Sequence, residues 1–314
     1  MDGPRTIEGW DEALTAYAAS ATARGDSRRS VAGRSSVLRR FGAWCEAQAL
    51  IRPTTVARPH LVAYQVALAA HRSRTGAPLH PATRRNHLTA LRVFFRWLKR
   101  SGRSLVDPAA DLELPRVVRP LPRGILTAQD LVALRVAIRL ARRNRLRDRA
   151  ILETLYATGV RREECVRLTL GDLDTQHQSL TVRRGKGGRQ RVVPIAPVAL
   201  GWIAAYRRRL ARLGGEPSSA MCPLFEGRRN RPLSAKHLSD RFRALLDAAG
   251  IDKPGACHLF RHAMATHMLD NGADIRFIQA MLGHADISTT IIYTHVSIRG
   301  LAEVYRRTHP SARI

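Results

Sequence analysis

A proline-rich stretch divides the chain into two parts. Residues 107–123 contain four prolines and little periodicity, so this stretch cannot continue a helix and is predicted to be an extended connector. On both sides of it apolar residues recur at spacings of three and four, which is typical of amphipathic helices. The 314 residues therefore predict a mainly α-helical protein with an N-terminal domain at 1–107, a linker at 108–123 and a second domain at 124–314.

The N-terminal part is predicted to be a small bundle of helices over residues 6–23, 30–49, 60–71 and 82–100. The last helix is the clearest, because its apolar residues share one face and its cations another. We predict that five polar residues of this helix contact the backbone and grooves of DNA: Arg84, Arg85, Asn86, Arg92 and Arg96. The alternative is a solvated helix face.

The second part is also mainly helical. Thr127 is a suitable N-cap for a helix that begins at Ala128, and the arginine-rich stretch 135–149 continues the helical pattern around Asn144. Two β-type runs, 179–184 and 190–195, flank a glycine-rich turn and predict a hairpin with a lysine at its tip. Further helices are predicted at 198–213, 234–249, 257–269 and 274–282.

The charge of the chain indicates a polyanionic partner. Its 53 basic and 25 acidic residues give a net charge of +28, far more than solubility requires, and nucleic acid is the leading candidate. The first 108 residues carry +11 and the remainder +17, so both parts are expected to touch the polyanion. In the second part, we predict that Lys236, Arg241 and Arg243 contact DNA.

Membrane insertion and secretion are not predicted. No apolar run approaches the ~20 residues of a membrane span, and the N-terminus lacks the basic-then-apolar order of a signal peptide, so we expect a cytoplasmic, nucleoid-associated protein. The four cysteines form no C-x-x-C pair and are expected to be buried thiols, without a disulfide framework or a cysteine zinc site.

Two cations stand at unusual places in the second part. Arg161 follows an apolar helix at a sharp turn, where a charge beside the core needs an anionic partner, either a ligand or Glu164 in a structural ion pair. Lys186 lies between glycines in a chain with only four lysines. An ammonium near other cations can become a general acid, which arginine cannot, although a turn lysine that serves solubility is the alternative.

Histidines and an arginine cluster at the start of the predicted helix 257–269. His258 and Arg261 are three residues apart and therefore share a face. The spacing of His258 and His262 also fits a zinc pair, but Leu259 stands where a metalloprotease carries its glutamate, so we predict no metal. His262 and His267 are interpreted as packed or hydrogen-bonded histidines.

A histidine and a tyrosine follow the next helix. Gly283 suits the left-handed residue that ends a helix, so His284 would be held on a rigid corner. Tyr293 has apolar neighbours and could belong to the core. Surrounded by arginines and histidines, however, its phenolate would be stabilised and could attack phosphorus. Taken together, these residue types are what phosphoryl transfer without a metal requires: Arg161, Lys186, His258, Arg261, His284 and Tyr293.

The motifs TGVRREE, RRGKGGRQRVVPI, HLFRHAMATHML and LGHADISTTIIYTHV resemble, in this order and spacing, the signature boxes of the tyrosine recombinases, or phage-integrase family, and most closely its Xer-type members. The resemblance spans most of the chain. It implies an N-terminal four-helix core-binding (SAM-like) domain and a mainly helical catalytic domain with a small β-hairpin or sheet. One departure is that Leu259 and Phe260 replace the usual Asp-Leu, which affects how that helix is capped.

The resemblance also implies a mechanism and roles for the six residues. Tyr293 would attack the scissile phosphate and form a 3′-phosphotyrosyl bond, while Arg161 and Arg261 clamp the phosphate. Lys186 would protonate the leaving oxygen, and His258 and His284 would assist proton transfer and charge stabilisation. No cofactor, metal or ATP is implied, and Glu164 is interpreted as a support for Arg161.

The implied partner is double-stranded DNA, with four protomers on two synapsed sites, possibly together with a second related recombinase.

Four residues of the C-terminal segment form an apolar stripe: Ile298, Leu301, Val304 and Tyr305. This stripe would dock on a neighbouring catalytic domain or fold back on its own. The competing functions are a type IB topoisomerase and a DNA-binding protein without catalysis.

Overall fold

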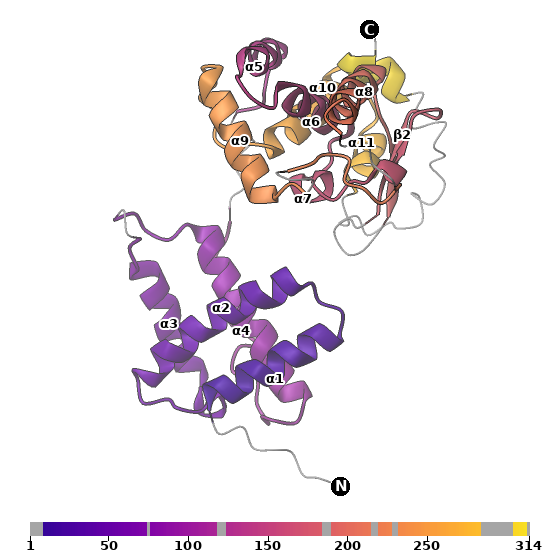
Figure 1. Ribbon diagram of the computed structural model, residues 1–314. Coiled ribbons are helices and arrows are strands. Elements are labelled where there is room, and N and C mark those ends of the chain that lie inside the picture. Colours follow the sequence, from indigo (N-terminus) through magenta and orange to yellow (C-terminus); the bar gives the residue numbers. More distant parts are fainter. Residues whose placement is uncertain are drawn as a thin grey trace. The chain divides into compact units, whose positions relative to one another are not determined.

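The computed structural model describes residues 9–73, 76–117, 124–183, 190–214, 219–227, 232–283 and 304–312. The chain divides into two compact units, Met1–Arg119 and Pro120–Ile314 (Figure 1). Three predicted catalytic residues, Lys186, His284 and Tyr293, lie outside the described residues. Within the described ranges, every helix is too short or too polar to span a lipid bilayer.

The first unit contains the helices that the periodicity predicts. They are α1 (Trp10–Ala23), α2 (Arg28–Glu46), α3 (Arg58–Ala70) and α4 (Pro81–Arg100), with a 3₁₀ turn at Pro53–Thr55 before α3. Helix α2 packs against α1 and α4, and α3 packs against α4. The core that they share is rich in aromatic rings, among them Tyr17, Phe41, Phe94 and Phe95, each fully buried. Each such ring buries roughly 150–250 Å², which is a large contribution to the stability of a core.

The segment after α4 also packs on the first unit. Ala109 is completely buried and Leu112 is 4% exposed within the same aromatic core. Arg85 and Arg92 of α4 donate hydrogen bonds to carbonyls of this segment, at Pro115 (3.1 Å) and Ala110 (3.2 Å). These two predicted DNA contacts therefore already have backbone partners, while Asn86 and Arg96 are exposed and the Arg84 Nε is buried without a hydrogen-bond partner.

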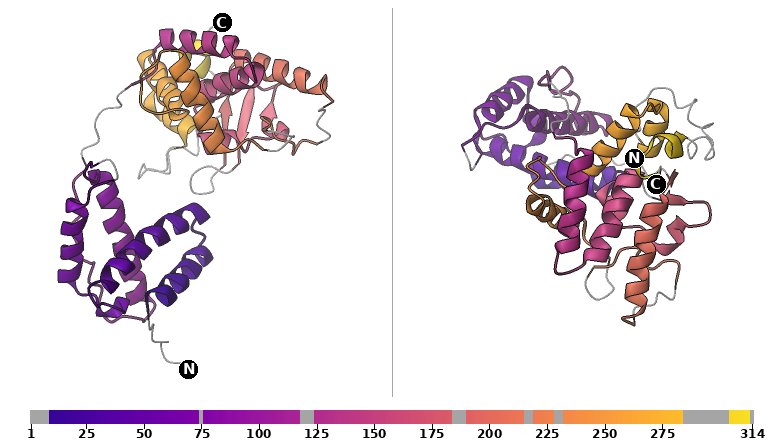
Figure 2. Two further views of the ribbon diagram at one scale, coloured as in Figure 1. Left: turned by 60° about the vertical axis from the view of Figure 1, so that its left-hand side comes forward. Right: turned by 90° about the horizontal axis from the view of Figure 1, so that it is seen from above.

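The second unit is built around one buried helix. Helix α6 (Arg145–Thr158) packs against α5 (Ala128–Leu140), α8 (Pro197–Ala211) and α10 (His258–Asp270). Nearly every residue of α6 is buried. Further helices in the described part of this unit include α7 (Arg162–Cys165), α9 (Ala235–Ala248) and α11 (Ile275–Leu282). Helix α11 lies at the edge of the small sheet (Figure 2).

The prediction of one helical stretch through 135–149 is wrong. Helix α5 ends at Leu140 and α6 begins at Arg145, because Asn144 takes the left-handed conformation with φ of 60°. Asparagine tolerates this conformation better than most residues do, and the pattern of apolar residues does not reveal it. The predicted N-cap at Thr127 is confirmed: its hydroxyl accepts a hydrogen bond from the Asp130 N–H, and the Asp130 carboxylate accepts one from the Thr127 N–H (2.7 Å).

The predicted hairpin is confirmed. Strand β2 (Ser179–Val182) pairs antiparallel with β3 (Arg191–Pro194), and Val182 lies opposite Arg191. The sequence did not reveal a two-residue strand, β1 (Leu173–Asp174), on the other side of β2. Because β3 contacts both α6 and α11, the sheet fixes the base of the hairpin on the helical core.

The described end of the chain folds back on its own second unit. Tyr305 is 2% exposed and belongs to the core of this unit, and Val304 packs against it. The 3₁₀ turn Pro310–Ala312 contacts α8. For Val304 and Tyr305 the fold-back alternative therefore holds in the single chain, whereas Ile298 and Leu301 lie outside the described residues.

Candidate active site

A glycine turn brings Arg161 out of the core. Gly159 ends α6 in the left-handed conformation with φ of 61°. Any other residue would be strained in this conformation, and its Cβ would lie 2.1 Å from the Met264 Cε and displace that side chain. The chain reverses here, and Arg161 stands immediately before α7 with its side chain 29% exposed.

Glu164 anchors this turn. Its carboxylate accepts hydrogen bonds from the backbone N–H of Arg161 (2.8 Å), from Arg161 Nη1 (2.8 Å) and from both Nη atoms of Arg191 (2.7 and 3.1 Å). Burial alone would raise the pKa of Glu164, but the hydrogen bonds and charges of Arg191 and Arg161 outweigh it and hold the pKa below its usual value. The structural ion pair between Arg161 and Glu164 thus exists, and Arg161 remains partly exposed beside it.

Arg261 approaches the same turn from α10. It donates hydrogen bonds to the carbonyls of Gly159 (2.6 Å) and Leu282 (2.6 Å), which ties the end of α6 to the end of α11. Burial, together with the positive charges of Arg161 and Arg191, lowers the pKa of Arg261 to about 9. The surroundings of Arg261 therefore carry too little negative charge to balance its protonated form.

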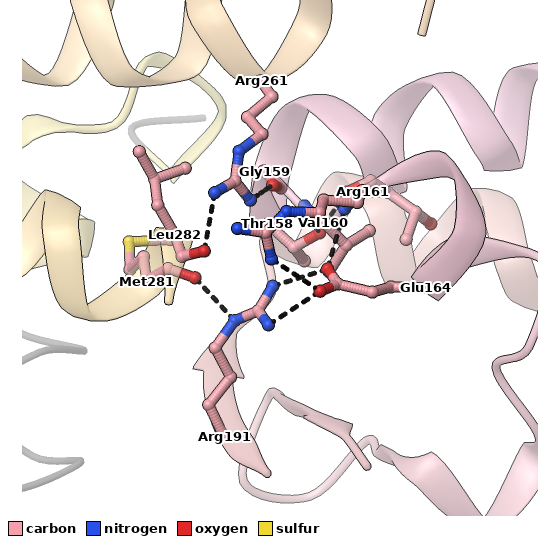
Figure 3. Close-up of polar contacts among 10 residues, drawn as sticks. Thr158, Gly159, Val160, Arg161, Glu164, Arg191, Arg261, Met281 and Leu282 are labelled. Atoms are coloured by element: carbon pink, nitrogen blue, oxygen red, sulfur yellow. Dashed lines mark hydrogen bonds and ion pairs between the residues drawn. The ribbon is translucent and has the colours of Figure 1, made fainter. Parts of the chain in front are cut away.

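The cluster as a whole has an excess of positive charge. Arg161 and Arg191 bind the Glu164 carboxylate, and Arg261 binds carbonyls at the same turn, so three cations and one anion give a formal charge of +2 (Figure 3). Like charges held together in a half-buried place cost free energy unless an anion joins them. Planar guanidinium groups match the oxygens of a phosphate, so the cluster is suited to bind one.

His258 begins α10, one helical turn before Arg261. Gly255 leaves room for its imidazole, because a Cβ there would lie 2.2 Å from the His258 Cε1. Burial, and to a lesser extent His262 and Arg162, lower the pKa of His258, so the ring is neutral at pH 7 and can accept a proton. The helix has Cys257 as its N-cap, without a side-chain hydrogen bond to the helix backbone.

Comparison with known proteins identifies the family. Residues 125–299 match the phage integrase family. Tyrosine recombinase XerC 2 of Ralstonia nicotianae is 42% identical over 290 residues, which cover 91% of this chain and 82% of the relative. Tyrosine recombinase XerD of Pseudomonas putida is 40% identical over 73% of this chain and 76% of its own.

The chain belongs to the phage integrase family. It is a tyrosine-type site-specific DNA recombinase.

Solved structures share the fold. XerH recombinase bound to its difH substrate aligns with a TM-score of 0.64 and 20% identity over 92% of this chain and 82% of its own. A lambda integrase fragment, a dimer bound to a core site, aligns with a TM-score of 0.65 and 18% identity over 88% of this chain and 95% of its own.

The other histidines of α10 differ from one another. His267 accepts or donates a hydrogen bond with the Tyr156 hydroxyl (2.9 Å), which confirms its structural interpretation. His262 is exposed, and its ring stands perpendicular to that of His258 with the ring centres 6.0 Å apart, so it packs on a neighbouring histidine and not in the core. In the part of the chain that the structure describes, no group of three or more histidine, cysteine or acidic residues could hold a metal.

The cations predicted to contact DNA in the recombinase's second unit already have protein partners. Lys236 pairs with Asp240 on the surface, at 2.6 Å, and Arg241 pairs with the buried Asp148 at 2.7 Å. Arg243 donates hydrogen bonds to three carbonyls of the loop before α10, among them that of Gly255 (3.0 Å). Contact with DNA stays a prediction for all three, and Arg243 in addition supports the glycine against which His258 packs.

Sequence reasoning missed Arg191. It lies within the second motif, where the pattern of residues alone indicates no role for it. A signal existed, since a charged residue opens a strand that is otherwise apolar, and a cation there must meet either solvent or an acid. Only the fold shows that this acid is Glu164, 27 residues earlier in the chain.

Proposed function

We propose that this recombinase cleaves one strand of duplex DNA with Tyr293, while Arg161 and Arg261 hold the scissile phosphate. The tyrosine oxygen attacks phosphorus, the bond from phosphorus to the 5′ oxygen breaks, and a 3′-phosphotyrosyl link remains. The positive charge gathered around Glu164 carries this proposal, because a phosphodiester supplies the anion that the cluster needs.

Proton transfer completes the reaction. The departing 5′ oxygen takes a proton from Lys186, and His258 and His284 assist proton transfer and neutralise charge on the phosphate. The lowered pKa of His258 supports its part in this scheme, since a neutral imidazole can accept a proton at pH 7. The phosphotyrosyl bond keeps the energy of the broken bond, so a 5′-hydroxyl of a second site can reverse the step and exchange strands.

The proposed partner is double-stranded DNA bound by both units. The net charge of +28 supports this, as do the fold relatives determined with DNA, the difH complex of XerH and the core-site complex of lambda integrase. We further propose four protomers on two synapsed sites, with a second related recombinase as a possible member, acting on the nucleoid in the cytoplasm.

A suicide duplex tests the proposal. A nick close to the cleavage point lets the short fragment diffuse away, so the wild-type protein should accumulate as a covalent complex on its site. Tyr293→Phe should bind the same duplex with unchanged affinity and form no covalent complex. Covalent attachment by Tyr293→Phe would refute the assignment of the nucleophile, and relaxation of supercoiled plasmids without any site would indicate a topoisomerase.

A further inference from the structure

Arg191 is the most constrained side chain around the proposed phosphate site. Its two Nη atoms form a fork on the Glu164 carboxylate, at 3.1 Å to Oε1 and 2.7 Å to Oε2. The same two oxygens accept from the Nη1 and the backbone N–H of Arg161, each at 2.8 Å. The Arg191 side chain is only 12% exposed. Glu164 is therefore held from both sides, and Arg191 fixes the carboxylate on which Arg161 rests.

The Nε of Arg191 holds a second element. It donates a hydrogen bond to the Met281 carbonyl (2.8 Å), in the last turn of α11. Carbonyls there have no partner within the helix, and a cation beside them is favourable. Gly283 follows in the left-handed conformation, and a Cβ on it would come within 3.0 Å of the Arg191 Cδ. Arg191 therefore holds the end of α11, from which the chain continues to His284.

The position of Arg191 in the sheet explains why it can do both. It is the first residue of β3 and pairs with Val182 of β2, at the base of the hairpin that carries Lys186 in the sequence. Strand β3 contacts α11 directly. One side chain at this point thus joins the hairpin base, the turn of Arg161 and the end of α11 (Figure 3).

We infer that Arg191 is a positioning residue for DNA cleavage: through Glu164 it aims Arg161 at the scissile phosphate, and through Met281 it sets the end of α11. This inference rests on the proposed function of Arg161. Arg191 itself does not touch the DNA in this arrangement. A lysine would keep the charge but lose the planar fork, so it could not hold the carboxylate and the carbonyl together.

Single-turnover cleavage of the suicide duplex provides the first test. We expect Arg191→Lys and Arg191→Gln to cleave roughly 10- to 100-fold more slowly than wild type with DNA affinity unchanged, because small displacements of catalytic groups have effects of this size. Arg183→Gln is the matched control, since Arg183 directly follows β2 of the same hairpin and is 57% exposed, and it should cleave at the wild-type rate. Rates of Arg191→Lys equal to those of wild type would overturn the inference.

A double-mutant cycle separates action through Glu164 from independent action. If Arg191 works through this carboxylate, Arg191→Gln combined with Glu164→Gln should be no slower than the slower single variant. Losses that multiply would mean that Arg191 acts on its own and would overturn the proposed route.

A neutral substrate distinguishes positioning from simple stabilisation of the fold. A methylphosphonate at the scissile position removes the charge that Arg161 neutralises, so the defects of Arg161→Ala and Arg191→Lys should both shrink on this duplex. A defect of Arg191→Lys that stays the same on both substrates would overturn the inference. If the wild-type protein did not cleave the unmodified suicide duplex, the proposed function itself would be refuted. The failure of the inference and the failure of the proposed function can therefore be distinguished.

Discussion

Two buried glutamates of the catalytic unit, Glu153 and Glu164, each hold two arginines, and their surroundings differ. Glu153 is 1% exposed and receives a fork from Arg135 (2.9 and 3.0 Å) and a third bond from Arg149 (2.7 Å). The Arg149 guanidinium lies 4.6 Å from the centre of the Trp202 ring, where the ring face also attracts it. The cluster at Glu153 thus has a formal charge of +1, one less than the cluster at Glu164.

At Glu164 a further cation, Arg261, approaches the same turn, and its pKa falls to about 9 because burial, and in addition the charges of Arg161 and Arg191, disfavour the protonated form. Arg161 keeps 29% of its side chain exposed. The two clusters use the same residue types, and the balance of charge distinguishes a place that stabilises the fold from a place prepared for an anion. Four predictions follow from this difference.

The largest expected effect concerns the unpaired charge. Arg261→Ala should slow single-turnover DNA cleavage by about 10²- to 10³-fold, the usual result of removing one donor to a developing negative charge. Arg149→Ala, the matched change at Glu153, should leave the cleavage rate of the folded protein unchanged and lower its unfolding temperature. Similar rate losses in both variants would remove the functional distinction between the clusters.

Removal of the carboxylate should reduce stability mainly at Glu153 and reduce cleavage mainly at Glu164. Glu153→Gln leaves two partly buried arginines, 26% and 19% exposed, without their anion, so the free energy of unfolding should fall by about 3 kcal/mol, measured with denaturant. The folded fraction should cleave DNA normally. The Glu164→Gln variant should instead remain folded and lose its cleavage activity. A Glu153→Gln variant that folds but does not cleave DNA would contradict the comparison.

The packing near Glu153 also predicts that the docking of residues 304–312 depends on pH. His309 stacks on Tyr305 with ring centres 4.6 Å apart, and its Nε2 lies 3.1 Å from the Tyr156 carbonyl oxygen. Burial, and to a lesser extent the charge of His267, lower the pKa of His309 to about 4. The undocked segment therefore binds the proton more readily than the docked one does.

The docking of residues 304–312 should accordingly be intact above pH 6.5 and weaken as the pH falls toward 4, with a loss of about 2 kcal/mol between pH 7 and 5. Hydrogen exchange of these residues measured across that range would show it. His309→Gln cannot titrate, so its exchange should change much less with pH, and an equal change in this variant would argue against His309 as the cause.

The smallest expected effect concerns Gly255, which leaves room for the His258 imidazole beside the Glu164 cluster. Gly255→Ala would push a methyl group into the imidazole, so cleavage should slow by roughly tenfold, as expected for a displaced catalytic group. Gly250→Ala is the control, because Gly250 also has a positive φ, of 69°, but a Cβ there meets nothing within 4 Å. It should lower stability by about 1 kcal/mol and leave the cleavage rate unchanged.

Much of this recombinase can be predicted from local patterns. The helices of the first unit, the N-cap at Thr127, the helix end at Gly283 and the hairpin depend on residues within a few positions of one another, and the structure confirms them. The break at Asn144 was missed, since a left-handed residue leaves no mark on the periodicity of apolar residues.

The candidate site likewise has features that the sequence predicts and features that only the fold shows. The sequence by itself determined that Arg161 stands at a sharp turn with Glu164 within reach, and that His258 and Arg261 share a helix face, because these pairs lie three residues apart. Only the tertiary structure decided that Arg191 completes the grip on Glu164, that Arg261 ties Gly159 to Leu282, and that the arginines outnumber the acid. The physical reason is that charge compensation depends on distance in space, and the partners here are separated by 21 to 102 residues of chain.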